Sequence, residues 1–362
     1  MFRRRFLQAL NFMGASLILP QSGGYDEGSL IIAPATTQPL IAPAYAVEVA
    51  NSGWDNPKVG IVAIGGSGCA ILSDLVARLP YLGLSIAIDT DVSALQRVKA
   101  DRKIMVGDGK ALPLNPHTAR LLAQSCVAEI VNAAAGLDMV FLVTGMGGAA
   151  GNGIAPIVAQ MLREQDILTL AFAILPSNFE SRQRQQNAQT GIRELRLHVN
   201  ALLPFSNGSI ERIAGENTSF NSVSSQAALA FDQLWQGILN PVCRPGWVNI
   251  DFEDLKHLIL SHDGDCAFGF GSASGKDGAA VAAQHAVDHP MLGRSRLQQA
   301  SAILVAVRAP PGALMLQDSK NAMKYIRKQF FHDPWIIYGA YYEGTQANEI
   351  TVSVLASGIP EN

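Results

Sequence analysis

The segment that most constrains how this chain folds runs from Val140 to Pro156 and reads VFLVTGMGGAAGNGIAP. An apolar run enters a nine-residue loop that holds five glycines, and a segment with helical apolar periodicity follows it. This order predicts a strand, a glycine loop and a helix. Glycines let the backbone turn at positive φ and approach a ligand, so several N–H groups point to one place beside a helix N-terminus. The segment therefore predicts a phosphate-binding loop, and the alternative is a turn that only packs a helix on a sheet.

A second unit of the same kind begins at Lys58. A strand leads into the turn GGSG at 65–68 and a helix, and a further strand over 84–88 ends in Asp89. Taken alone, this unit predicts a dinucleotide-binding fold with Asp89 on the ribose, as in oxidoreductases that use NAD. A dinucleotide fold needs only one glycine cradle, so the richer loop that begins at Gly145 points to another fold.

Composition indicates a globular chain with a large core and no polyanion partner. The chain has 362 residues, of which 48% are hydrophobic and 16% charged, and this length favours two subdomains. A net charge of −3 with scattered Lys and Arg gives no footprint for nucleic acid. The four cysteines lie far apart and predict reduced core residues. His285 and His289 stand at helical spacing, but without a third ligand nearby they predict a helix end stopped by Pro290 and no metal site.

Residues 1–50 predict an extension that precedes the globular part. Arg3 to Arg5 and the apolar run up to Leu19 resemble a twin-arginine export signal, although the run is too short to span a bilayer, where about 20 residues are needed. The alternatives are an amphipathic helix over residues 2–19 that lies on a membrane surface, and an unstructured segment. We favour the membrane-surface helix and a cytoplasmic location, because the rest of the chain has the pattern of a user of a cytoplasmic nucleotide.

Seven motifs, in order along the chain, resemble the FtsZ family of the tubulin superfamily. The resemblance covers about Lys58 to Ile359 and implies an α/β fold with a parallel-sheet nucleotide-binding domain, a long central helix and a smaller mixed-sheet C-terminal domain. The implied parts are an N-terminal extension (1–50), a nucleotide-binding domain (51–222), a central helix with its connection (223–250) and a C-terminal domain (251–362). The motifs are GGSG (65–68), DTD (89–91), TGMGGAAGNGIAP (144–156), SNFESRQR (177–184), RPGWVNIDFEDL (244–255), ASGKD (273–277) and EITVSVLASGI (349–359).

The resemblance implies GTP as the bound cofactor, with Mg²⁺ beside its phosphates. Asp89 and Asp91 would lie near the nucleotide and its metal shell, while Glu180 and Arg184 would face the ribose and phosphates. A carboxylate accepts hydrogen bonds from ribose hydroxyls, and a guanidinium complements phosphate charge. The alternative for Glu180 and Arg184 is a surface ion pair one helical turn apart. The implied phosphate loops comprise Gly65, Gly66, Ser67, Gly68, Gly145, Gly147, Gly148, Ala149, Ala150, Gly151, Asn152 and Gly153.

The chain departs from the family pattern on its nucleotide side. Ala150 and Asn152 stand where the family carries hydroxyl residues, and a lost hydroxyl contact should cost about 1–3 kcal/mol. Pro113, which has no N–H to donate, lies where the family has a glycine-rich loop at the terminal phosphate. Three residues stand where the family stacks an aromatic ring on guanine and hydrogen-bonds its edge: Ser224, Ala228 and Leu229. The preference for guanine is therefore open.

Asn249, Asp251 and Asp254 in VNIDFEDL are the candidate catalytic residues. By the resemblance, their loop docks on the nucleotide pocket of the next subunit, where its acids orient the water that attacks the terminal phosphate. Repeated head-to-tail contacts of this kind make open filaments. A structural role is compatible with this one: Asp251 caps the helix that begins at Phe252, and Asp254 is a first-turn acid.

Two versions of the function follow from the resemblance. In the first, the chain is a GTPase that assembles with itself, with a filament role in cell division or a related process. In the second, it is a weak or non-hydrolysing relative that copolymerises with a conventional FtsZ, which the intact Asn249 to Asp254 face slightly favours. Only three residues follow Ile359, where family members continue into a peptide that binds membrane anchors, so residues 2–19 are the expected membrane contact.

Overall fold

The computed structural model describes residues 57–79, 83–109, 115–208, 220–243, 246–342 and 349–361; for 220–224 it describes the backbone alone. The expectations for the N-terminal 50 residues and for Pro113 lie outside the described residues. Within the described ranges, no helix is long and apolar enough to cross a membrane. The predicted domain boundaries at 222 and 250 remain predictions.

The first sheet is six-stranded, with every neighbouring pair parallel and the order β3-β2-β1-β4-β5-β6. Its inner strands are apolar almost throughout because both faces of the sheet are covered. The strands are β1 (Val59–Ile64), β2 (Leu84–Asp89), β3 (Arg102–Met105), β4 (Met139–Gly145), β5 (Leu168–Leu175) and β6 (Ala201–Ser206).

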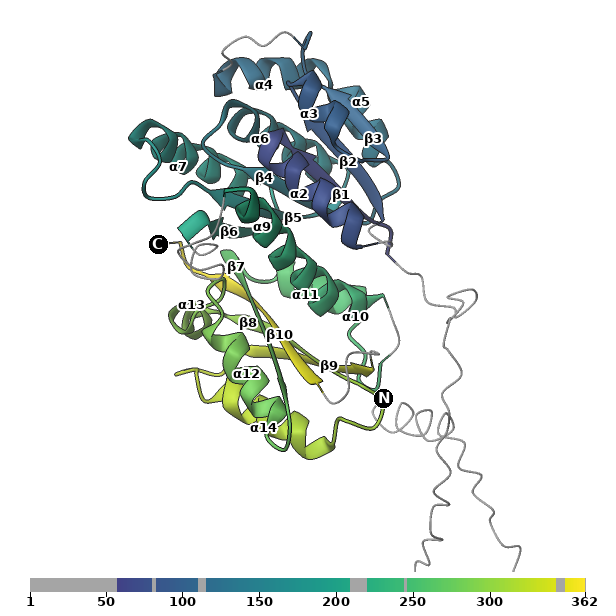
Figure 1. Cartoon of the computed structure of the whole chain (residues 1–362), viewed down its shortest axis with the longest axis vertical. Helices are drawn as coiled ribbons and strands as arrows, with labels where there is room; N and C mark the ends of the chain where they lie inside the picture. Colours follow the sequence, from purple (N-terminus) through teal and green to yellow (C-terminus); the bar gives the residue numbers. More distant parts are fainter. Residues whose placement is uncertain are drawn as a thin grey trace, which may run out of the picture. The chain divides into compact units, whose positions relative to one another are not determined.

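Helices cover both faces of this sheet (Figure 1). One face, with Ile61 and Ala63 of β1, packs on α2, α3 and the central helix. The other face, with Val62 and Ile64, packs on α4, α5, α6 and α7. Since successive strand residues point to opposite faces, one apolar strand fills two cores. The helices are α2 (Gly65–Arg78), α3 (Val92–Arg97), α4 (Pro116–Ser125), α5 (Val127–Ala134), α6 (Ala149–Glu164) and α7 (Arg182–Arg196).

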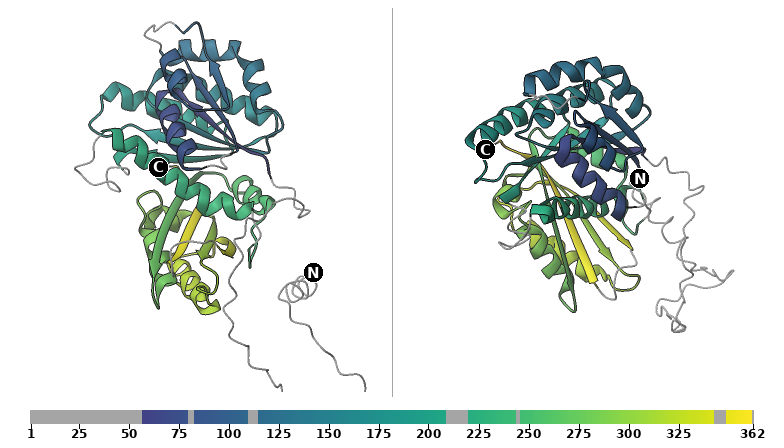
Figure 2. Two further views of the ribbon diagram at one scale, coloured as in Figure 1. Left: turned by 45° about the vertical axis from the view of Figure 1, so that its right-hand side comes forward. Right: turned by 45° about the horizontal axis from the view of Figure 1, so that its top comes forward.

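A continuous helical segment, which we call the central helix, lies between the two sheets (Figure 2). It consists of α9 (Phe220–Leu234), the π-helical turn η1 (Trp235–Leu239) and α10 (Asn240–Val242), and it is about 35 Å long. Phe231 contacts Phe141 and Phe172 of the first sheet edge to face, with ring centroids 5.3 and 5.6 Å apart. On the opposite side, a Cβ added to Gly237 would lie 2.2 Å from Ser353 Oγ of the second sheet. A glycine in the π turn thus lets the helix approach that sheet closely.

The second sheet is mixed, with the order β7-β10-β8-β9, in which β10 is antiparallel to β7 and β8 while β8 and β9 are parallel. One face packs on the central helix and α11, and the other on α12, α13 and α14. These elements are α11 (Phe252–Leu260), β7 (Asp265–Ser274), α12 (Gly278–Asp288), α13 (Arg294–Gln299), β8 (Ala302–Ala309), α14 (Leu316–Arg327), β9 (Trp335–Tyr342) and β10 (Glu349–Ile359). The fold class predicted from the sequence is confirmed.

Smaller predictions are confirmed as well. All four cysteines are free thiols; Cys69 and Cys266 are buried as expected of core residues, whereas Cys126 and Cys243 are only half-buried. Helix α12 ends at Asp288, just before the His-Pro pair that predicted a helix end.

The two sheet domains are also joined by a bidentate ion pair, in which Arg196 of α7 donates to both oxygens of Asp265 of β7 at 3.0 Å.

Candidate functional site

The two glycine loops lie against each other at the carboxyl edge of the first sheet. Strands β1 and β4 are neighbours with Ile64 opposite Thr144, so the loops leave the sheet side by side. A Cβ added to Gly65 would lie 3.1 Å from the Cβ of Ala150, and one added to Gly145 would lie 2.6 Å from the Cβ of Ser67. The loops therefore form one continuous backbone surface from which α2 and α6 begin.

Glycines in these loops serve two different purposes. A Cβ on Gly68 would lie 2.5 Å from Val143 O, one on Gly151 would lie 2.0 Å from Gly145 O, and one on Gly153 would lie 2.3 Å from Pro116 O, so these three are required by packing. The other kind has open space in front of it, with no protein atom within 4 Å of the added Cβ and no positive φ. This kind comprises Gly66 and Gly148. The protein itself does not need glycine there, and a closely approaching ligand would.

Both helices begin without a side-chain cap. Ile64 precedes α2 and Gly148 precedes α6, and neither gives a side-chain hydrogen bond to the first turn. The first-turn N–H groups of a helix have no intrahelical acceptor, and the helix dipole adds positive charge at the same end. Two such ends at one edge of the sheet, one on each of its faces, suit an anion with several oxygens, such as a phosphate chain.

Asn152 occupies a bracing position inside α6. Its side chain is only 5% exposed, its Oδ1 accepts from Gly147 N–H at 3.0 Å, and its Nδ2 donates to Asn187 O of α7 at 2.8 Å. A Cβ on Gly191 of α7 would lie 2.5 Å from Asn152 Oδ1. The amide therefore ties the glycine loop to α7, and its predicted contact with phosphate remains a prediction.

Replacing Asn152 with alanine is expected to destabilise the protein. Asn152→Ala leaves the buried Gly147 N–H without its acceptor, and a buried polar group left unpaired costs about 1–3 kcal/mol. The measurement is the free energy of unfolding in urea. The control is Asn187→Ala, which removes a half-buried side chain bonded only to Gln183 on the same helix and keeps the backbone carbonyl, so it should change the stability by less than about 0.5 kcal/mol. Equal losses in the two variants would contradict the bracing role.

Asp89 ends β2 at the same edge and holds an oxygen without a partner. The residue is 3% exposed, and its Oδ1 accepts from the backbone N–H groups of Thr90 and Asp91 at 2.7 and 3.2 Å. Its Oδ2 is buried and has no hydrogen-bond partner among the residues that the structure describes. Ile88 pairs with Ile64, the residue that precedes α2, so Asp89 lies beside the start of that helix. Burial and the Asp89 charge together raise the pKa of the Cys69 thiol of α2 to about 12. A buried carboxylate oxygen calls for a donor, and a ribose hydroxyl or a hydrated cation supplies one.

The charge of Asp89 predicts a pH-dependent effect of its replacement. Burial raises the pKa of this carboxyl above its usual range. The folded protein then holds the proton more tightly than the unfolded chain, so the contribution of Asp89 to stability is greatest below the unfolded pKa and is lost as pH rises through the folded pKa. Asp89→Asn keeps an acceptor for the two N–H groups and carries no charge. It should raise the thermal midpoint of the ligand-free protein near pH 8, and the gain should shrink toward pH 4; a gain that grows on acidification would contradict this account.

Asp91, Glu180 and Arg184 have partners within the protein. Asp91 caps α3 by accepting from Ser93 N–H at 2.7 Å. Glu180 Oε2 pairs with Arg184 Nε at 2.8 Å, which is the ion pair expected from their spacing. Arg184 also packs on the glycine loop, because a Cβ on Gly147 would lie 2.8 Å from its Cγ. Its half-exposed side chain therefore lies beside the loops, where a guanidinium can neutralise phosphate charge.

The side of the site expected to bind the base is apolar where the structure describes it. Ala228 of α9 is fully buried in the core, and Leu229 is half-buried. Ser225, one residue after the aligned Ser224, donates to Asp74 of α2 at 2.9 Å and so fastens α9 to the helix of the first glycine loop. Neither Ala228 nor Leu229 has a side-chain group that can hydrogen-bond a base. The side chain of Ser224 lies outside the described residues.

The candidate catalytic loop is attached to the second sheet. Val248 pairs with Ala340 of β9 through hydrogen bonds of 3.2 and 2.9 Å, and Asn249 Oδ1 accepts from Gly246 N–H. Ile250 is buried, whereas Val248, Asn249 and Asp251 on either side of it are exposed. Asp251 and Asp254 then form a capping box on α11, because each carboxylate accepts from the other's backbone N–H, at 2.7 and 3.1 Å. The structural role predicted for these acids is confirmed, and it holds the Asp251 carboxylate at an exposed, fixed position.

These acids do not lie beside the glycine loops of their own chain. They follow α10 at the far end of the helical segment, about 35 Å from its start. Figure 1 shows α10 and α11 on the side where β1 begins, whereas the glycine loops follow the ends of β1 and β4. The structure thus brings the two loops, Asp89 and Arg184 to one edge, and it places Asn249, Asp251 and Asp254 elsewhere.

Two glycine loops on a parallel sheet, joined through a long helix to a mixed-sheet domain, define a nucleotide-binding α/β protein. Comparison with known families specifies which one. The model of the Tubulin/FtsZ family, GTPase domain, matches residues 58–215, and that of the FtsZ family, C-terminal domain, matches residues 264–360. The chain belongs to the FtsZ family. The alternative of an NAD-dependent oxidoreductase is therefore wrong: the second glycine loop, which a dinucleotide fold does not need, is part of the family's GTPase domain.

Individual relatives agree with this assignment. "Cell division protein FtsZ" of Caulobacter vibrioides is 32% identical over 84% of this chain, which spans 60% of that protein. The protein of the same name from Rickettsia conorii is 30% identical over 84% of this chain and 68% of its own length. Among solved structures, an FtsZ dimer of M. jannaschii has a TM-score of 0.74 at 27% identity and covers 83% of this chain and 88% of its own. CetZ2 of Haloferax volcanii, at a TM-score of 0.73, 18% identity and coverages of 84% and 94%, supports the fold alone.

Proposed function

We propose that this chain binds a guanine nucleotide on its two glycine loops and assembles head to tail, so that residues 246–254 of one subunit complete the site of the next. The observation that carries the proposal is the position of Asp251 and Asp254. Their loop is fixed and exposed, and it lies at the other end of the central helix from the glycine loops. A contact that repeats between unlike faces generates a filament. The relatives named as cell division proteins suggest that the filament serves cell division.

Each described group has a role in the proposed reaction. The first-turn N–H groups of α2 and α6 bind the phosphates, Arg184 neutralises their charge, and Asp89 Oδ2 accepts from the ribose. Asp251 of the neighbouring subunit accepts the proton of the attacking water and holds it in line with the leaving oxygen. Mg²⁺, when bound, would offset the negative charge between the phosphates. It would be held chiefly by phosphate oxygens, because Mg²⁺ in nucleotide sites takes phosphate oxygens and water in preference to an all-protein cage.

A second version, copolymerisation with a conventional FtsZ, rests on the receiving face. Ala150 offers a methyl group to the loop, the Asn152 amide is used within the protein, and Ala228 is buried. A chain that binds nucleotide weakly but has an intact Asp251 loop would place its carboxylates beside the nucleotide bound by a partner subunit. If so, the purified chain hydrolyses GTP slowly on its own and accelerates hydrolysis when mixed with a conventional relative. A cytoplasmic location and membrane contact through residues 2–19 also belong to this proposal.

Ligand-dependent unfolding tests the nucleotide class directly. The thermal midpoint would be measured with GTP, ATP and NAD in turn, each with Mg²⁺. A ligand present at about 100 times its Kd adds about 2.7 kcal/mol to the free energy of unfolding. We expect GTP to give the largest shift. A larger shift with NAD, or equal shifts with all three, would overturn the assignment of the loops to a guanine nucleotide.

A further inference from the structure

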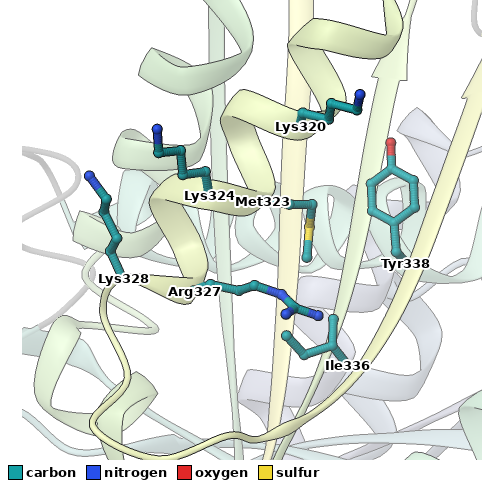
Figure 3. Close-up of a pocket in the computed structure, with 7 residues that line it drawn as sticks. All are labelled: Lys320, Met323, Lys324, Arg327, Lys328, Ile336 and Tyr338. Carbon is teal, nitrogen blue, oxygen red and sulfur yellow. The ribbon is translucent and has the colours of Figure 1, made fainter.

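A second candidate binding surface lies on the C-terminal domain, between α14 and β9. We call it the basic groove; its volume is about 670 Å³. Figure 3 shows its apolar floor of Met323, Ile336 and Tyr338, with basic side chains along α14. The basic residues are Lys320, Lys324, Arg327 and Lys328. None of these residues belongs to the nucleotide site or to the loop with Asp251.

The positive charges of the basic groove are not neutralised within the described part of the chain. All four side chains are exposed, and none has a carboxylate within 4.0 Å among the described residues. The acid on the same helix, Asp318, is turned to the helix start, where its Oδ2 accepts from Met315 N–H at 2.9 Å. Lys320, Lys324 and Lys328 follow at intervals of four residues, and like charges at this spacing weaken a helix. The arrangement therefore favours an anionic partner over a role in stability.

Two of the three floor residues, Ile336 and Tyr338, lie on β9, which is an outer strand of the second sheet. Strand β9 pairs with β8 on one side, and on its other side the described structure has only the bridge between Val248 and Ala340. Alternate residues of a strand turn their backbone groups to the same side. Ile336 and Tyr338 therefore direct N–H and C=O to the outer edge, as Ala340 does toward Val248. No strand of the described ranges lies there to pair with them.

The side chains at this edge face the basic helix. Ile336 and Tyr338 pack with the core that α14 covers, whereas Ile337 and Tyr341 face the central helix. A strand added to β9 would lie about 4.8 Å away, and alternate side chains of that strand would point toward the α14 side. Figure 3 shows the side chains of Lys320 and Arg327 directed toward β9, so carboxylates at those positions would meet these two cations. The added strand's backbone would pair with Ile336 and Tyr338.

We propose that the basic groove binds an acidic segment of a partner protein in extended conformation, which adds to the outer edge of β9 with its carboxylates against α14. Such strand addition gains affinity from main-chain hydrogen bonds and specificity from alternate side chains. The outward N–H and C=O groups of β9 can hydrogen-bond the backbone of a peptide, and a membrane surface offers no such strand. The inference does not depend on the proposed nucleotide function.

The test uses the full chain and a fluorescent peptide of alternating Glu and Val, with fluorescence anisotropy as the measurement. We expect binding that weakens as salt is added. The double variant Lys320→Glu, Arg327→Glu should weaken it at least tenfold, and the conservative Lys320→Arg should not. Lys103→Glu, an exposed lysine on the first domain, is the matched control and should have no effect. A Lys/Val peptide should not bind.

The strand edge is tested separately with Ile336→Pro. Proline removes the outward N–H of Ile336 and leaves the β8 side of the strand in place, so the peptide should bind more weakly. An unchanged circular dichroism spectrum and thermal midpoint would show that the variant is folded; if it is not, a peptide with N-methylated backbone replaces it as the test. No peptide binding at 1 mM, or equal binding by the charge-reversed variant, would overturn the proposal. So would charge-dependent binding to phosphatidylserine vesicles without peptide binding, which would make the surface a membrane contact.

Discussion

Asp251→Asn is expected to lower GTP hydrolysis by this chain by about 10²- to 10⁴-fold, the usual contribution of a positioned proton acceptor. Asparagine caps a helix as well as aspartate does, so the bond to Asp254 N–H and the start of α11 should survive. Nucleotide affinity should also survive, because the residue lies far from the glycine loops of its own chain. The measurement is phosphate release at several protein concentrations, with nucleotide binding measured in parallel.

The matched control is Glu253→Gln on the same first turn. Glu253 is an exposed acid that pairs only loosely with Lys256, at 3.8 Å, and it is not a partner in the capping box. Its replacement removes the same charge from α11 two residues away, and hydrolysis should stay within about threefold of the unmodified chain, which corresponds to less than 1 kcal/mol. Equal losses from Asp251→Asn and Glu253→Gln would mean that the helix start acts through its charge, and the assigned role of Asp251 would be wrong.

Gly66→Ala should weaken nucleotide binding at least tenfold without changing the stability of the ligand-free protein. The added methyl group meets no protein atom within 4 Å, and the backbone is not at positive φ, so the fold has room for it. In the proposed site the same space belongs to the phosphates. Titration of the variant with GTP, and thermal unfolding without nucleotide, give the two quantities.

Gly151→Ala provides the contrast for this experiment. Its Cβ would lie 2.0 Å from Gly145 O, a backbone atom that cannot move without disturbing the loop. We expect a loss of several kcal/mol in the free energy of unfolding, in the upper part of the range for single substitutions. If Gly66→Ala were as destabilising as Gly151→Ala, or if it bound GTP normally, the open space at Gly66 would not be a ligand position.

The fold was predictable where local pattern and composition agree. The apolar runs of β1 and β4 had to be buried on both faces, and the glycines after them had to be turns between strand and helix. The capping box of Asp251 and Asp254 was equally readable, because a cap and its partner lie three residues apart. In each case the sequence distance that determines the feature is short.

Features that depend on distant partners were not readable. The side chain of Asn152 bonds to Gly147 N–H and to the carbonyl of Asn187, which the sequence pattern did not predict, and its contact with the phosphates remains a prediction. One signal was available: Gly191 inside α7, where glycine costs a helix about 1 kcal/mol, marks a close approach. The pairing of Val248 with Ala340 joins segments far apart in sequence, and no local pattern indicates it.

Mixing two inactive variants tests the central claim, that one subunit completes the site of the next. Gly66→Ala has an impaired pocket and an intact Asp251 loop, whereas Asp251→Asn has the reverse. In an equimolar mixture, about one interface in four joins an intact loop to an intact pocket, because the two faces of each contact come from different copies. With GTP well below the Kd of the Gly66→Ala variant, each variant alone should be nearly inactive, and hydrolysis in the mixture should recover to about one quarter of the unmodified rate. A mixture as inactive as its components would contradict it.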